Sequence, residues 1–379
     1  MRAMNLTPEL TFLIALLVFW AVLYALSRVF HLEKRGLDVK PAYFMYKSKG
    51  LNSFIERLAK KRRFMWLTFS NMGVAFSVGL MIFSLYFLAN NLAGFFVPAV
   101  EAVPIFPVLP GLTIRLYWLP YFFVAAAIVI LSHELAHGVV ARLENIPVLS
   151  TGVAMALVFF GAFVEPDEKE FEKASLLARL RMLGAGSATN LVTALLFFLL
   201  LEGLFAAPAG IMIQETLPNG PLEEAGLRQW DFIDKINDTR IVGLEDFYGF
   251  MENKTPGVVL VLHTNKGNFN VTTVEGSQGQ AILGVFPTVY RPNRLGLEHY
   301  TAVNLYWTLF WIHLIALSLA IFNMLPLYPF DGERFLYYPI AGLMIKHKRE
   351  VRGAINALSL GLIALNMFLS LWKYGLRPI

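Results

Sequence analysis

Two histidines one helical turn apart are the residues of this chain that point most directly to chemistry. They belong to the sequence His-Glu-Leu-Ala-His at 133–137. On a helix, His133 and His137 lie on the same face, so both imidazoles can bind one metal ion. Glu134 lies about 100° around the helix axis, where it can hold a metal-bound water without being a ligand itself. The spacing therefore predicts a catalytic zinc site with Glu134 as the base.

A catalytic zinc site commonly has three protein ligands, so a third ligand is expected elsewhere in the chain. Asp331 is the best candidate because it follows an apolar run broken by Pro326 and Pro329. Prolines end a helix and leave carbonyl groups free, which is costly in lipid unless the segment packs against a site. A helix-capping role for Asp331 is the alternative, and Glu165 or Glu333 are the other candidate ligands.

The elements that must position these residues are membrane helices. The chain has 379 residues, of which 56% are hydrophobic and 16% charged, whereas soluble proteins carry about 25% charged residues. Six runs contain no Asp, Glu, Lys or Arg, and with slight extension each can cross a bilayer. These runs are Leu10–Ser27, Met65–Val100, Leu116–Ser132, Leu183–Leu201, His299–Phe330 and Gly353–Trp372. We therefore expect a mainly α-helical bundle of about six transmembrane helices.

The histidine motif follows the third of these runs. A charge at the centre of a membrane helix costs about 2.5–3.5 kcal/mol even on a lenient scale, so ionisable groups there usually have a function. A pair of interfacial histidines without a metal is the alternative. The chain contains no cysteine, which excludes disulfides, a thiolate nucleophile and a cysteine-type zinc site.

Basic residues are concentrated in one segment, which predicts the orientation. The segment His31–Phe64 contains ten Lys/Arg and three acidic residues, although the whole chain has a net charge of only +5. Such a block between two spans indicates the cytoplasmic side, with a nucleic-acid patch as the weaker alternative. The clusters at 169–181 and 346–352 then also lie inside. We expect a cell-membrane protein with its N-terminus outside and its active site toward the cytoplasm.

The uncharged segment Asn145–Val164 is expected to differ from the six spans. If it crossed the membrane, the basic residues after it would lie outside, so we expect a re-entrant, β-like structure. Such backbone must be buried in protein or line a wet cavity. Its edge could pair with an unwound substrate, which makes Gly161 and Phe163 candidate substrate-binding residues.

Charged residues and short β-rich stretches return in the interval 209–290. Turn sequences at 218–220 and 265–267 separate some of these stretches. We therefore expect three regions: a transmembrane region with the histidine motif at 1–208, a small β-rich domain outside the membrane at 209–290, and a second transmembrane region at 291–379.

The two motifs together resemble the signatures of the site-2 protease family of intramembrane metalloproteases. HELAHG at 133–138 and NMLPLYPFDG at 323–332 match the family's HExxH and NxxPxxxxDG elements. The resemblance implies that His133, His137 and Asp331 bind one zinc ion per chain. It also implies that Glu134 activates water, and that the substrate is a transmembrane segment of another protein.

Two further resemblances are less complete. Residues 186–190 resemble the family's G-x-x-x-N element, with Ser187 where proline is common. Asn190 and Asn323 are therefore candidates for holding the substrate carbonyl or the oxyanion, with hydrogen bonding between helices as the alternative. The inserted domain resembles a PDZ domain of proteases, although Trp230 replaces the usual glycine before Asp231. A different small β-rich module is the alternative.

These observations predict an intramembrane zinc endopeptidase whose partners are the bilayer and a membrane-anchored substrate, with no nucleic acid. The rival interpretation is a non-catalytic membrane scaffold or transporter whose PDZ-like domain binds partner tails. The presence of Glu134 argues against the rival, because a site that only binds metal needs no base.

Overall fold

The computed structural model describes residues 8–110, 113–343 and 346–375. The chain separates into two compact units. Unit 1 comprises Met1–Phe197 and Trp311–Ile379, and unit 2 comprises Phe198–Phe310.

Six of the helices in the described part of the chain are long and apolar enough to cross a membrane. They are α1 (Pro8–Val29), α3 (Arg63–Ala93), α4 (Leu119–Leu143), α6 (Leu176–Leu204), α9 (His299–Phe322) and α11 (Lys348–Tyr374). Each contains one of the six uncharged runs or most of it. The expectation of a mainly helical membrane protein with about six spans is therefore confirmed. The shorter helices α2 (Asn52–Lys61), α5 (Glu168–Lys173) and α10 (Asp331–Leu343) lie between them in sequence.

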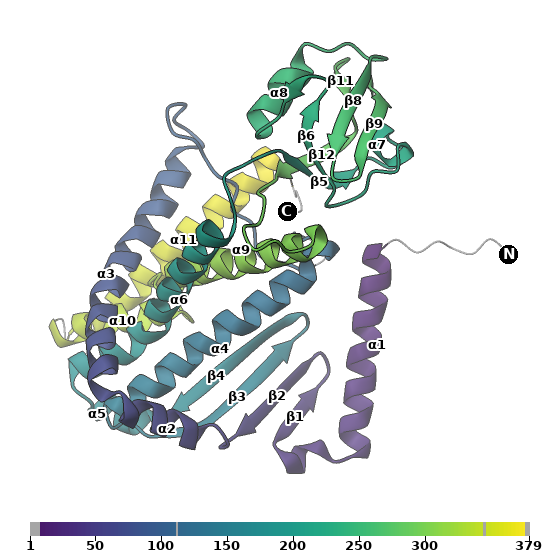
Figure 1. Ribbon diagram of the computed structural model, residues 1–379. Coiled ribbons are helices and arrows are strands. Elements are labelled where there is room, and N and C mark those ends of the chain that lie inside the picture. The colour runs from purple at the N-terminus through teal and green to yellow at the C-terminus, as the bar shows by residue number, and fades with distance from the viewer. Residues whose placement is uncertain (1–7, 111–112, 344–345, 376–379) are drawn as a thin grey trace. The chain divides into compact units, whose positions relative to one another are not determined.

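Unit 1 also contains a four-stranded antiparallel sheet (Figure 1). Its order is β1 (Leu37–Lys40), β2 (Tyr43–Ser48), β3 (Val148–Ala156) and β4 (Phe159–Pro166). The expected β-like structure after position 145 is the hairpin of β3 and β4. The basic segment, expected only as a cytoplasmic connection, supplies β1, β2 and α2 as well. The strand β4 lies against α4, the helix that carries the histidine motif (Figure 1).

Unit 2 contains the β-rich domain expected from the sequence. Its main sheet has the order β12-β5-β6-β8-β9, and β7 pairs with β6. The strands are β5 (Ile211–Thr216), β6 (Phe232–Ile236), β7 (Thr239–Arg240), β8 (Val259–Thr264), β9 (Gly267–Thr272) and β12 (Val285–Val289). A second pair consists of β10 (Val274–Glu275) and β11 (Ala281–Ile282). The helices α7 (Pro221–Glu224) and α8 (Leu244–Glu252) complete it, around a core of buried Ile and Leu side chains.

Trp230, the unusual residue before Asp231, joins this sheet to the start of α9 within unit 2. Its backbone has φ of +73°, a left-handed conformation that favours glycine. The strain is offset by contacts: His299 Nε2 lies 2.7 Å from the Trp230 carbonyl oxygen, and the rings of Trp230 and Trp307 are 5.7 Å apart. The neighbouring Asp231 accepts a hydrogen bond of 2.9 Å from the Tyr300 hydroxyl. The departure from glycine therefore has a packing reason.

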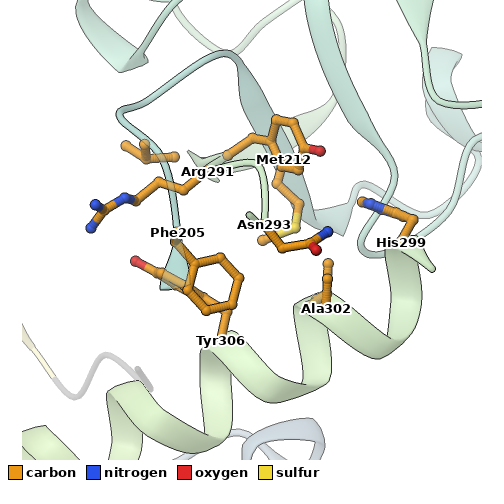
Figure 2. A pocket seen from close by; sticks show the side chains of 10 residues that line it. Phe205, Met212, Arg291, Asn293, His299, Ala302 and Tyr306 are labelled. Atoms are coloured by element: carbon orange, nitrogen blue, oxygen red, sulfur yellow. The ribbon is translucent and has the colours of Figure 1, made fainter. Parts of the chain in front are cut away.

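A small cavity lies beside these contacts, between Met212 of β5 and His299, Ala302 and Tyr306 of α9 (Figure 2). Its volume is about 10 Å³, which is the space needed for about one water molecule. We interpret it as a packing gap in unit 2 and not as a ligand site.

Candidate metal centre

His133 and His137 lie on the buried face of α4. Their exposed fractions are 5% and 7%, and their Nε2 atoms are 3.0 Å apart. The sequence forms a helix here because Leu, Ile, Val and Ala dominate the preceding three turns, and Pro120 stands in the first turn, where its missing N–H costs nothing. The i and i+4 positions then place both rings on one side, as the motif predicts.

Asp331 is brought to these histidines from the other end of the sequence. Its Oδ2 atom lies 3.1 Å from His133 Nε2 and 3.2 Å from His137 Nε2. It is the first residue of α10, where the helix dipole favours a carboxylate. The three side chains form the one cluster of potential metal ligands found among the described residues.

Gly332 explains how α10 can begin so close to the end of α9. Its N–H donates to the Asn323 carbonyl at 2.8 Å. A Cβ atom at position 332 would lie 2.2 Å from the Met324 carbonyl oxygen, which no side chain can tolerate. Only glycine fits at position 332, because its main chain lies directly against that of Asn323 and Met324. This close contact places the preceding residue, Asp331, beside the histidines.

The three ligand atoms fit a zinc ion. Two ligands of a tetrahedral zinc ion with bonds of about 2.1 Å lie about 3.4 Å apart. The observed separations of 3.0, 3.1 and 3.2 Å are close to this value. Two imidazoles and one carboxylate also form a typical catalytic donor set.

The remaining nitrogen of each imidazole is held by a neighbour on α6, so that Nε2 faces the cluster. His137 Nδ1 donates to the Met182 carbonyl at 2.7 Å, and His133 Nδ1 lies 3.0 Å from the side-chain amide of Asn190. The Asn190 atom at this distance is Nδ2, which is a donor, and the buried Oδ1 has no hydrogen-bond partner among the described residues. A histidine that binds metal through Nε2 carries its proton on Nδ1, so ligation by His133 requires the amide turned by 180°, with Oδ1 accepting that proton. Asn190 is fully buried.

Glu134 lies beside the metal ligands but is not one of them. Its Oε2 atom accepts a hydrogen bond of 3.0 Å from the Val164 main-chain N–H. Because Val164 belongs to β4, the carboxylate is anchored between the histidine helix and an edge strand. This contact was not predicted from the sequence, because nothing in the motif indicates which backbone group will meet the glutamate.

The other candidate residues are placed as follows. Asn323 Nδ2 lies 3.5 Å from His133 Nε2, at the edge of the cluster. The Phe163 ring lies over Gly152 of β3 and 5.7 Å from Lys47 Nζ of β2, so it packs on the sheet. Gly161 lies opposite Ala154 on β3, and the space in front of it is open.

The two alternative ligands are engaged elsewhere. Glu165 accepts hydrogen bonds from Ser150 at 2.5 Å and from Lys47 at 3.0 Å, on the sheet. Glu333 is 3% exposed and faces Arg352 of α11. Neither carboxylate joins the histidine cluster.

The Glu333–Arg352 pair holds the loop that carries Asp331. Arg352 Nε and Nη2 both donate to the Glu333 carboxylate, the second at 2.8 Å. Four residues further along α11, the Asn356 Oδ1 atom accepts from the Tyr328 N–H at 2.7 Å. The pairing was not predicted, because the need for a cation follows from the burial of Glu333, which the sequence does not show.

We expect Arg352→Met to loosen the metal site, because it leaves the buried Glu333 carboxylate without its partner. The cost should be about 2 kcal/mol of stability, below the 3–5 kcal/mol of a fully buried pair, because the Arg352 side chain is 43% exposed. Thermal unfolding and the rate of zinc loss to a chelator measure the effect. Arg349→Met, which removes an exposed charge from the same helix, is the control. Equal behaviour of the two variants would show that the pair does not support the site.

The comparison with protein families agrees with this geometry. The model of "Peptidase family M50" matches residues 121–368, which include most of α4, the hairpin, unit 2 and the Asp331 loop. This chain belongs to peptidase family M50. The resemblance to site-2 proteases is thereby confirmed, and the protein is a zinc metalloprotease whose cofactor is zinc.

Three relatives of this M50 peptidase illustrate the extent of the similarity. An uncharacterized protein of Methanocaldococcus jannaschii is 27% identical over 336 residues, which cover 87% of this chain and 85% of the relative. The probable protease eep of Enterococcus faecalis is 24% identical, and the zinc metalloprotease RasP of Oceanobacillus iheyensis is 23% identical. Each match covers 55% of this chain and 62% of the relative.

Among solved structures, the PDZ domain of an SdrC-like protein from Listeria innocua matches 24% of this M50 chain and 98% of that domain. The identity is 14% and the TM-score is 0.19. The PDZ-like character of unit 2 therefore remains a prediction from its sequence.

Proposed function

We propose that this M50 peptidase hydrolyses peptide bonds within transmembrane segments of membrane-anchored proteins. The observation that supports this most directly is the position of its ligand set. Two ligands lie on α4, a helix long and apolar enough to span a bilayer, and both are buried in unit 1. A site built there favours apolar substrates that are already in the membrane.

In this proposal His133, His137 and Asp331 would hold one zinc ion, which would supply Lewis-acid activation of the scissile carbonyl and of a water. Glu134 takes a proton from the attacking water and passes it to the leaving amine. The Val164 N–H keeps its carboxylate in place during both transfers. Asn190 keeps His133 in the orientation that ligation requires. Asn323, at the rim, is the candidate donor to the developing oxyanion.

Substrate presentation is assigned to the edge of β4. A transmembrane helix satisfies its own amides, so the scissile bond is accessible only after local unwinding. An exposed strand edge can replace the lost hydrogen bonds by pairing with the unwound chain. The strand β4 pairs with β3 on one side, and the open space at Gly161 leaves room for a substrate side chain. Phe163 would contribute to the sheet face that supports this strand.

The decisive experiment uses a purified protein in lipid nanodiscs with a single-span substrate. Cleavage should cease after treatment with a chelator and return when zinc is added, because the bound zinc would supply the Lewis acid that activates the carbonyl and the water. Mass spectrometry should place the cut inside the apolar segment. If the protein binds stoichiometric zinc but cleaves none of a panel of transmembrane peptides, the scaffold or transporter interpretation would be preferred.

We also propose that the basic segment His31–Phe64 faces the cytoplasm and that the inserted β-rich domain at 209–290 is extracytoplasmic, since basic loops are retained inside. The chain has no native cysteine, so single cysteines can be introduced cleanly. Lys49→Cys and Asp238→Cys, both at exposed positions, should react with an impermeant maleimide from opposite sides of sealed vesicles. Labelling of both from one side would refute this orientation.

A further inference from the structure

A cationic cavity lies at one end of unit 1, away from the metal ligands. It is formed where α2, the start of α3 and the end of α4 meet, and its volume is about 350 Å³. Its charged lining residues are Lys60, Arg63, Arg142 and Glu56. A volume of this size lies within the usual range of small-ligand sites.

Both arginines have N–H groups that are not used in hydrogen bonds within the described part of the protein. Arg63 uses Nη1 on the Leu143 carbonyl, and Arg142 uses Nη2 on the Val148 carbonyl, each at 3.2 Å. The Arg142 Nε atom is buried and has no hydrogen-bond partner among the described residues. Each guanidinium carries five N–H donors, so both can still bind an anion.

The one acidic side chain in the lining forms its ion pair with a lysine and not with either arginine. Glu56 is paired with Lys60 at 2.7 Å, one turn along α2. Within the part of the chain that the structure describes, no carboxylate forms an ion pair with Arg63 or Arg142. The lining therefore carries three positive charges against the one negative charge of Glu56, a net charge of +2.

The position of the cavity near the ends of two membrane helices indicates which anion it binds. The helix α3 has 31 residues, which is about 46 Å at 1.5 Å per residue, so it extends beyond a hydrocarbon core of about 30 Å. Arg63 is its first residue and Arg142 is the second-last residue of α4. Directly after Arg63, Phe64 is 84% exposed, which is typical of a side chain that contacts lipid. Charge and apolar surface therefore meet at the level of the headgroups.

We propose that this cavity binds the phosphate of an anionic phospholipid headgroup. Guanidinium groups bind phosphate oxygens in pairs, and basic pockets between membrane helices are suited to such headgroups. Arg63 and Arg142 donate to the phosphate, and Lys60 and Asn145 close the cavity around it. This site is independent of the proposed cleavage reaction and requires only that the helices lie in a membrane.

The test is the retention of phosphatidylglycerol by the full-length protein in nanodiscs that contain phosphatidylglycerol and phosphatidylcholine. Enrichment of phosphatidylglycerol is expected for the wild type. Arg63→Gln should reduce it about tenfold, the scale of a lost charge-assisted hydrogen bond, and Lys60→Gln about fivefold. Lys61→Gln removes the same charge from the adjacent, exposed position outside the cavity and should leave retention unchanged. If Arg63→Gln fails to fold, Lys60→Gln still tests the proposal, because the Lys60 side chain makes no main-chain contact within the described chain that its loss would break.

The remaining outcomes overturn the proposal. Equal loss in Lys61→Gln would show a diffuse surface attraction and no defined site. An absence of preference over phosphatidylcholine would show that the cavity does not recognise the headgroup charge. If millimolar inorganic phosphate displaces the lipid completely from the wild type and binds with the same dependence on Arg63, the site is one for a soluble phosphate anion.

Discussion

Purified Glu134→Gln protein is expected to retain zinc near one ion per chain while its cleavage rate falls about 100-fold or more, the scale of a lost general base. Glutamine has the same shape, and its amide oxygen can still accept the hydrogen bond from Val164. The ligand cluster of His133, His137 and Asp331 is therefore undisturbed. Only the capacity to take a proton from water is lost. Metal analysis beside single-turnover cleavage separates these two effects.

Asp331→Ala should behave in the opposite way and lose zinc and activity together. It removes the carboxylate that lies 3.1 and 3.2 Å from the two histidines. Two imidazoles alone do not hold zinc against a chelator, so excess zinc should restore part of both properties. If Glu134→Gln loses its zinc while Asp331→Ala retains it, the assignment of base and ligand is wrong.

Gly186→Ala is expected to weaken zinc binding, although Gly186 lies on α6, a helix that supplies no metal ligand. A Cβ atom at position 186 would lie 2.4 Å from His133 Nε2 and from His137 Nε2. The rings have no room to retreat, because Asn190 and the Met182 carbonyl hold their Nδ1 atoms. Zinc affinity should fall by at least the 10- to 100-fold that lost ligand orientation usually causes.

Gly203→Ala is the matched control for this substitution. Position 203 lies on the same helix α6, and no atom lies within 4 Å of the added Cβ. The control should bind zinc and cleave substrate as the wild type does. Zinc binding by Gly186→Ala equal to that of Gly203→Ala would show that the ligands sit differently from the arrangement described here.

The features that are best predicted from the sequence depend on the helical spacing of residues and on local composition. The six spans follow from charge-free length, because lipid excludes unpaired polar groups. The pairing of His133 with His137 follows from helical geometry. Asp331 was identified because two prolines and a carboxylate after an apolar run are costly unless they serve a site. Each of these predictions uses residues close together in the chain.

The features that were missed depend on contacts between distant segments. The strands β1 and β2 lie within the most basic part of the chain, and their pairing with β3 connects residues more than 100 positions apart. The Val164 amide and the Met182 carbonyl are main-chain groups, which carry no sequence signal of their own. Arg352 looked like an ordinary cytoplasmic charge until its partner, Glu333, was found to be buried.

The hydrogen bond between Val164 and Glu134 has a consequence for which insertions the protein can tolerate. Successive residues of a strand direct their N–H groups to opposite edges, and a slip of one residue moves every side chain to the other face. One residue added between Phe160 and Val164 would therefore turn the wrong amide toward Glu134. Two added residues would again direct an N–H group of the correct edge toward Glu134. Length variation in this half of the hairpin should thus be tolerated in even steps only.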